Sequence, residues 1–183
     1  LLGLGSGDLA RRVSLQGRLL LFYSGLLGMR QRSGVALEQL LEDFFGVPVE
    51  VEQFRGGWYG LSESSQCRID EEEGLGGGLG EGTVVGDEIW DPQARVRIRV
   101  GPLSRREYDD FLPGGAAHET LGEITRFFSD GQVDFEVQLV LDREEVPGVV
   151  LGSEERGPPP LGWCTWLSTK TPPHHADETI LLI

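Results

Sequence analysis

Apolar residues recur at helical spacing in four stretches of the chain. In the clearest of them, SGVALEQLLEDFFG (33–46), Ser33 suits an N-cap, a broad apolar stripe follows, and Gly46 suits a left-handed end. Similar spacing occurs in SLQGRLLLFYSGLLGMRQ (14–31), in AAHETLGEITRFFSDG (116–131) and, more briefly, in PLSRREYDDFLPGG (102–115). The pattern therefore predicts a helix in each stretch.

Other stretches alternate apolar and polar residues, which is the period of a β-strand. They are VPVEVEQF (47–54), TVVGDEIWD (83–91), ARVRIRVG (94–101) and VDFEVQLVL (133–141). In ARVRIRVG the arginines alternate with valine and isoleucine, as in a half-buried strand with one wet face. Together the two patterns predict an α+β fold, in which short antiparallel strands pack with amphipathic helices.

Two long segments with weak patterning, about residues 55–82 and 143–168, are predicted to be irregular arms. Each follows a helix–strand unit whose helix ends in Phe-Phe, and each carries a Gly-Trp element, GGWYGL (56–61) or LGWCTWL (161–167). This order is typical of a degenerate internal repeat. Two loosely spaced copies are explained equally well by chance similarity, so both interpretations stand.

The length and composition predict one domain over residues 1–168, followed by a polar tail over 169–183. The chain does not begin with Met and lacks the features of a signal peptide, so we expect a fragment whose N-terminal part is missing. The tryptophan-bearing parts of the two arms lie at about 55–69 and 146–168.

A formal net charge of −14 disfavours binding to nucleic acid, because such binding needs a basic surface that replaces the counterions of the phosphates. The same charge disfavours attachment to an anionic membrane, and no apolar run approaches the ~20 residues of a membrane span. Cys67 and Cys164 lie far apart in the sequence and are expected to be thiols in a reducing compartment.

Candidate chemistry is concentrated near the end of the chain, where Cys164 is followed by His174, His175 and Asp177. A thiol nucleophile needs a base within hydrogen-bond reach, and zinc needs about four convergent ligands. Two prolines and the adjacency of the histidines disfavour both arrangements, and the Gly-rich stretch 74–82 matches no nucleotide-binding motif. We therefore expect no catalytic residue, metal or cofactor, and keep a small metal- or thiol-dependent enzyme as the alternative.

The tryptophans indicate a different function, because large aromatic side chains dominate the energetics of protein interfaces. We expect the Gly-Trp elements to contact a partner protein through Trp58, Tyr59, Leu61, Trp163, Trp166 and Leu167. For Trp90 a contact with the domain's own core is an equally good interpretation.

Four co-linear segments resemble the TssG family, also called ImpH or VasB, of bacterial type VI secretion. They are LEQLLEDFFGVPVEVEQFRGGW (37–58), VVGDEIWDPQARVRIRVGPLSRREYDDFLPGG (84–115), VDFEVQLVLDREEVPGVVLG (133–152) and LGWCTWL (161–167). The chain departs from the family in GGWYGL, where members more often read close to GRWLPL, and in Cys164, where a small residue or Thr is usual.

The resemblance implies a structural baseplate subunit without catalytic activity. Such a subunit pairs with two copies of TssF in the baseplate wedge, contacts TssE, and holds TssK trimers through extended loops. It is cytoplasmic and is assembled at the inner face of the bacterial inner membrane, without inserting into it. A wedge protein of a related contractile, phage-tail-like injection system remains the alternative.

Overall fold

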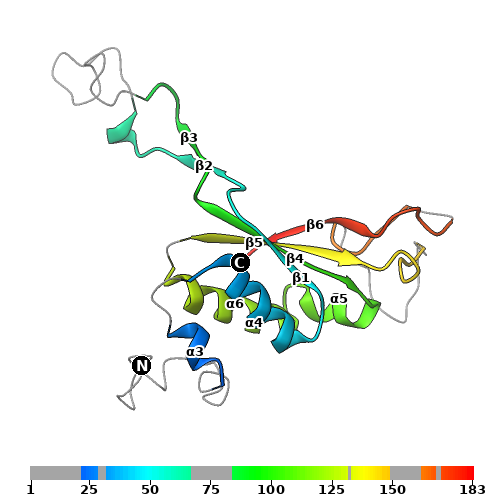
Figure 1. Cartoon of the computed structure of the whole chain (residues 1–183). Coiled ribbons are helices and arrows are strands. Elements are labelled where there is room, and N and C mark those ends of the chain that lie inside the picture. The colour runs from blue at the N-terminus through cyan, green and yellow to red at the C-terminus, as the bar shows by residue number, and fades with distance from the viewer. Residues whose placement is uncertain (1–21, 29–31, 67–83, 132, 149–161, 168–169) are drawn as a thin grey trace.

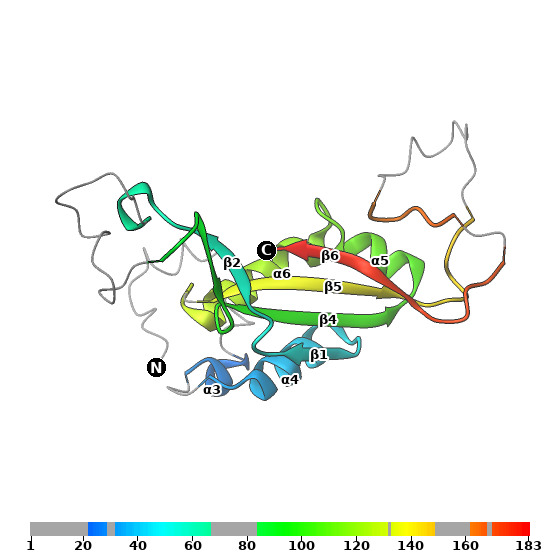
Figure 2. The same ribbon diagram turned by 90° about the horizontal axis from the view of Figure 1, so that it is seen from above.

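A computed structural model describes residues 22–28, 32–66, 84–131, 133–148, 162–167 and 170–183. A four-stranded sheet carries the main helices on one face, and a two-stranded ribbon extends from one of its ends (Figures 1 and 2). The α+β class is thereby confirmed. The elements are α3 (Ser24–Leu27), α4 (Gly34–Phe45), β1 (Val49–Glu52), β2 (Gly57–Gly60), η1 (Glu63–Ser65), β3 (Glu88–Asp91), β4 (Arg95–Leu103), α5 (Arg105–Phe111), α6 (Ala116–Ser129), β5 (Asp134–Leu141) and β6 (Ala176–Leu182).

The main helices begin and end where their capping residues predict. Ser33 accepts a hydrogen bond from the backbone N–H of Ala36 at the start of α4, and Gly46 ends the helix with φ 68°. Ser104 and Glu107 form a capping box at the start of α5. The left-handed residue after α6 is Asp130, with φ 54°, directly before Gly131. Of the helix predicted over 14–31, only α3 lies within the described residues.

The strand order of the sheet is β1-β4-β5-β6. β1 pairs antiparallel with β4, as predicted for this fold, and β6, a strand that was not predicted, pairs antiparallel with β5. The central pair differs from the prediction, because β4 and β5 are parallel. Helices α5 and α6 lie between these strands in the chain, and such a helical crossover returns the chain to the edge where the first strand began.

The segment predicted to be a polar tail, 169–183, contains the edge strand β6. Ala176, Thr179 and Leu181 of this strand are buried against the helices. The alternation was hard to recognise because a polar run precedes the strand and a threonine occupies one of its inward positions. The end of the chain is therefore part of the core.

The hydrophobic core lies between the sheet and helices α4, α5 and α6. Ile98, Val137 and Leu139 point from the sheet into this layer and are fully buried. The opposite face of the sheet is charged, as the alternation of ARVRIRVG predicts. On that face Glu136 is 6% exposed and pairs with Arg97 at 2.5 Å and Arg95 at 3.7 Å. The sheet thus has one apolar and one ionic face.

The first predicted arm is partly regular, because β2 pairs antiparallel with β3. Both strands of this ribbon lie between β1 and β4 in the chain, and the ribbon projects beyond the sheet (Figure 1). Phe54 and Gly56, with φ 62° and 65°, interrupt the ladder between the two pairs. The rest of this arm, residues 67–83, lies outside the described residues. Of the second arm, residues 149–161 lie outside them, and a bridge joins Gly148 to Trp166.

Candidate functional site

Two tryptophans form an exposed pair on the ribbon. Trp58 of β2 lies directly opposite Trp90 of β3, and the two rings meet edge to face with centroids 5.5 Å apart. The side chains are nevertheless 61% and 47% exposed. Such a cross-strand aromatic pair stabilises a ribbon by up to about 1 kcal/mol and leaves a large apolar surface open to a partner. We call Trp58 and Trp90 the indole pair.

The backbone under the indole pair is glycine because the Trp90 ring lies against it. A Cβ on Gly56 would stand 2.4 Å from Cζ2 of Trp90, and the residue has φ 65°. A Cβ on the next residue, Gly57, would meet the guanidinium of Arg95 at 3.2 Å. Gly56 and Gly57 are buried, so the first two glycines of GGWYGL serve the packing of the ribbon.

Tyr59 lies on the other face of the ribbon, opposite Ile89. Its hydroxyl donates a hydrogen bond of 2.6 Å to Oδ2 of Asp134 at the start of β5. This hydrogen bond raises the pKa of Tyr59, with a further contribution from burial. Tyr59 and Leu61 are half-buried, so of the predicted contact residues in this arm Trp58 presents the most surface.

The second Gly-Trp element lies at the opposite end of the sheet from the ribbon (Figure 2). Leu167 is 99% exposed and Trp163 is 39% exposed. Trp166 is half-buried, because its ring packs on Tyr108 at a centroid distance of 5.9 Å and its Nε1–H donates to Glu178 at 3.2 Å. Trp166 therefore has a role within the domain in addition to any contact with a partner.

A buried polar network fixes this second element to the core. The hydroxyls of Tyr108 and Thr179 both reach the carbonyl oxygen of Trp163, at 2.5 and 3.0 Å, and lie 2.7 Å from each other. Tyr108 is fully buried, and its burial raises the pKa of the phenol. The neighbouring Cys164 is a buried thiol and is 5% exposed. Cys67 lies outside the described residues.

The candidate catalytic residues are not arranged as a site. His174, His175 and Asp177 line a hollow with Arg99 and Arg143, whereas Cys164 does not line it. Nδ1 of His175 accepts a hydrogen bond from the backbone N–H of Arg143, and Asp177 pairs with Arg99 at 3.4 Å. Within the part of the chain that the structure describes, no group of three or more His, Cys, Asp or Glu side chains could hold a metal ion.

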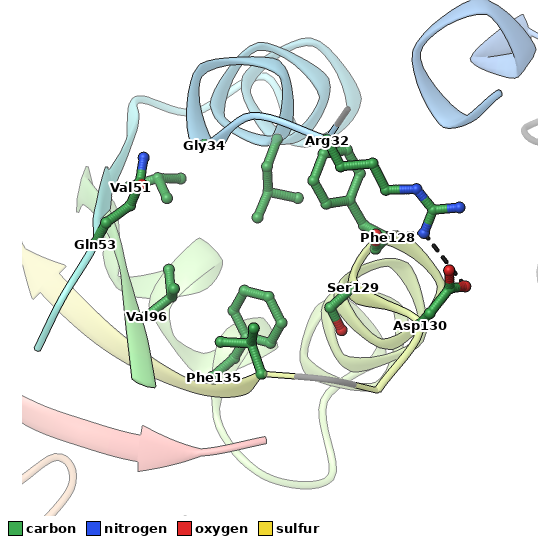
Figure 3. A pocket seen from close by; sticks show the side chains of 11 residues that line it. Arg32, Gly34, Val51, Gln53, Val96, Phe128, Ser129, Asp130 and Phe135 are labelled. Carbon is green, nitrogen blue, oxygen red and sulfur yellow. Dashed lines mark hydrogen bonds and ion pairs between the residues drawn. The ribbon is translucent and has the colours of Figure 1, made fainter. Parts of the chain in front are cut away.

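A pocket of about 440 Å³ opens between α4, α6 and the ends of the central strands (Figure 3). Its lining mixes polar and apolar side chains, with Leu37 and Phe135 among the buried apolar members. Arg32 points away from its centre and donates to the carbonyl oxygens of Phe127 and Phe128, at 2.8 and 2.5 Å, and pairs with Asp130 at 3.4 Å. Arg32, the basic residue among the described lining, thus caps the C-terminal end of α6.

Among the described residues, no helix has the length and apolar character needed to cross a bilayer. The residue that sequence reasoning had left open is Trp90. Its place became clear from the register, since pairing GGWY with EIWD puts Trp90 opposite Trp58. The sequence predicts an irregular arm over 55–82, so this register is visible only in the structure.

Comparison with known proteins identifies the family. The model described as "Type VI secretion, TssG" matches residues 1–168. None of the curated proteins compared matches the chain. A chain of the TssK–TssF–TssG baseplate subcomplex of the type VI secretion system, determined by cryo-electron microscopy, is 18% identical with a TM-score of 0.73, over 98% of this chain and 75% of that one.

A chain of the type VI secretion baseplate complex is 19% identical with a TM-score of 0.66. That match covers 99% of this chain and 50% of the other, so this chain spans half the length of that neighbour. At these identities the two likenesses show the fold. The match of the family model over residues 1–168 shows more, and confirms the resemblance seen in the sequence: the chain belongs to the TssG family of type VI secretion proteins.

Proposed function

We propose that this protein is a structural subunit of the baseplate wedge, which scaffolds TssF and docks TssK through its exposed aromatic surfaces. The observation that carries the proposal is the indole pair. Two large apolar rings stand exposed on a ribbon that projects from the sheet, where a monomeric domain gains little from them. Aromatic side chains in such positions are typical of interface hot spots.

The assembly of the neighbouring structures supports the identity of the partners. One neighbour belongs to a complex of TssK, TssF and TssG, and the chain described here has the same fold. In our proposal the ribbon and the segment 162–167 receive copies of the same partner, TssK, and TssE contacts the wedge. The two surfaces lie at opposite ends of the sheet, which leaves room for two partners at once (Figure 2).

We further propose that the protein has no catalytic role, binds no nucleic acid, and works in the cytoplasm at the inner face of the bacterial inner membrane. The net charge of −14 supports the absence of nucleic-acid binding. The separation of Cys164 from the hollow lined by His174 supports the absence of catalysis. The alternative of a wedge role in another contractile injection system is disfavoured by the match to a type VI family.

Co-purification of the chain with TssF and TssK from the same secretion system tests the proposal. Replacing both Trp58 and Trp90 by Ala should lower TssK recovery at least about tenfold, as expected for interface hot spots, while TssF recovery stays unchanged. Phe22→Ala is the matched control, because Phe22 is 76% exposed but lies on neither aromatic surface. Undiminished TssK recovery with the double variant would contradict the docking role.

The second surface is tested separately through Trp163 and Leu167. Replacing both by Ala should reduce the number of TssK trimers bound per chain, measured by mass photometry of the purified complex. Trp166 is left intact in this variant, because its removal also disturbs the contact with Tyr108. Full TssK occupancy after the Trp163/Leu167 change would show that this surface is not a docking site.

A further inference from the structure

Beyond the base of the ribbon, where Arg55 and Arg95 lie, the described charged side chains are all acidic. In the described outer part of the ribbon, residues 56–66 and 84–94, the charged side chains are Glu63, Asp87, Glu88 and Asp91. Asp87, Glu88 and Asp91 are exposed. Because side chains alternate along a strand, Glu88 shares a face with Trp90, and its cross-strand neighbour Gly60 has no side chain to cover it. The indole pair therefore has a carboxylate beside it.

Among the described residues, the basic side chains next to the ribbon are Arg55 and Arg95 at its base, and both are paired there. Arg55 lies 2.6 Å from a carboxylate oxygen of Glu52, and Arg95 lies 3.7 Å from Glu136. Each guanidinium already lies beside a carboxylate, which reduces the positive charge that the base of the ribbon presents to the outer carboxylates. The outer ribbon thus presents apolar rings within a negative field, which favours a cationic partner surface.

We propose that the ribbon enters an apolar cleft edged by lysine or arginine side chains on the partner, with a cation lying over an indole face and facing Glu88. This inference rests on the docking role proposed above and adds the chemistry of the partner surface. A cation over a Trp ring contributes roughly 0.5–2 kcal/mol, and more when water is excluded from the contact. Carboxylates around the rings would attract such a cation before contact.

Charge also favours a basic protein surface over other binding partners of the ribbon. A second copy of the chain carries the same net charge of −14, so its approach to the acidic ribbon is repelled. Nucleic acid and anionic lipid are repelled for the same reason. A basic protein surface is the occupant that complements both the rings and the carboxylates.

The test is the rate of association between the full chain and the TssK of the same system, measured by stopped flow at about 50 and about 500 mM NaCl, where the screening length differs roughly threefold. The variant Asp87→Asn/Glu88→Gln should associate about 3–10-fold more slowly at low salt and equal the parent at high salt. Asp110→Asn/Glu119→Gln is the control, with the same change in net charge at exposed positions on α5 and α6.

The outcomes distinguish this inference from the docking role. If both double variants associate as fast as the parent at low salt, the partner surface is not basic, and the inference fails even when loss of the indole pair still abolishes binding. Equal slowing by the control would likewise overturn it, because only overall charge would then matter. If loss of the indole pair leaves the affinity unchanged at both salt concentrations, the docking role itself fails.

Discussion

The hydroxyl of Tyr59 donates a hydrogen bond of 2.6 Å to Oδ2 of Asp134, although the two residues lie 75 positions apart in the chain. One belongs to the projecting ribbon and the other begins the central strand β5. Because Tyr59 points to this anchor, alternation turns Trp58 to the opposite face of the ribbon. The tie therefore determines which way the indole pair faces.

Removing the hydrogen bond between Tyr59 and Asp134 should increase the motion of the ribbon without unfolding the domain. For Tyr59→Phe we expect a change in the free energy of unfolding within about 0.5 kcal/mol, since the bond is exposed. Amide hydrogen exchange in β2 and β3 should become faster, and exchange in β4 and β5 should not. Asp134→Ala should reproduce the effect, whereas Asp134→Asn keeps an acceptor and should not. Unchanged ribbon exchange in Tyr59→Phe would show that the tie does not hold the ribbon.

Glycine at position 56 is predicted to be needed for the Trp90 ring to pack in its observed position. Gly56→Ala introduces a Cβ at 2.4 Å from the ring and places a non-glycine residue at φ 65°. The expected cost is about 1–2 kcal/mol, with a displaced indole and an altered tryptophan near-UV circular dichroism signal. Gly60→Ala, in the strand that follows Gly56, is the matched control, because a Cβ there meets no atom within 4 Å. Equal behaviour of the two variants would contradict this packing.

The second tryptophan element is predicted to contribute to stability through Tyr108. Tyr108→Phe removes a buried donor from the Trp163 carbonyl and should lower the free energy of unfolding by about 1–2 kcal/mol. Trp166→Ala should cost about 2–3 kcal/mol, because a half-buried ring is lost. Leu167→Ala should leave stability unchanged, since Leu167 is 99% exposed. Urea denaturation compares the variants, and an equal midpoint for Tyr108→Phe and the parent would refute the proposed network.

The buried Glu136 should be the most sensitive position on the ionic face of the sheet. Glu136→Ala leaves Arg95 and Arg97 facing each other without their common carboxylate, and should cost about 2–3 kcal/mol. Glu136→Gln keeps the shape and a hydrogen-bond acceptor, so its cost should be smaller. Thermal unfolding measures both variants. A fully stable Glu136→Ala protein would show that this ion pair is replaceable by solvent.

All three tyrosines of the chain are predicted to have raised pKa values, so their phenols should ionise at a higher pH than usual. Burial and a hydrogen bond to Asp43 raise the pKa of Tyr23 to about 12, and the pKa values of Tyr59 and Tyr108 are raised above the ordinary 10. Since the folded pKa values exceed the unfolded ones, the stabilisation is complete below pH 10 and is lost as the pH rises toward 12. Phenolate absorbance at high pH should therefore increase together with unfolding. A phenol that ionises near its ordinary pKa while circular dichroism stays native would contradict these shifts.

The helices and most strands were predictable because their signals are local. Ser33 with Gly46, and Ser104 with Glu107, mark helix ends within one or two turns of the chain. The alternation of Arg97 with Ile98 gives the strand period and also the two faces of the sheet. The family motifs were equally local, and the family match confirmed them.

Features that depend on which segments meet were not predictable in this way. The parallel pairing of β4 with β5 follows from the path of two helices, and β6 became a strand because β5 offered it an open edge. Trp166 looked like a surface residue until Tyr108, far away in the sequence, was found beneath its ring. Predicted partner contacts in the sequence therefore divide into exposed and packed residues only once the fold is known.

The sequence by itself determined the main helices, most of the sheet strands, the acidic character and the family of this protein, because capping, periodicity and charge are properties of neighbouring residues. Only the tertiary structure decided which aromatic residues remain available to a partner. Trp58 stays exposed because the bond from Tyr59 to Asp134 turns it outward, and Trp90 joins it because Gly56 leaves space for its ring. Exposure depends on contacts between distant segments, and such contacts are formed only when the chain folds.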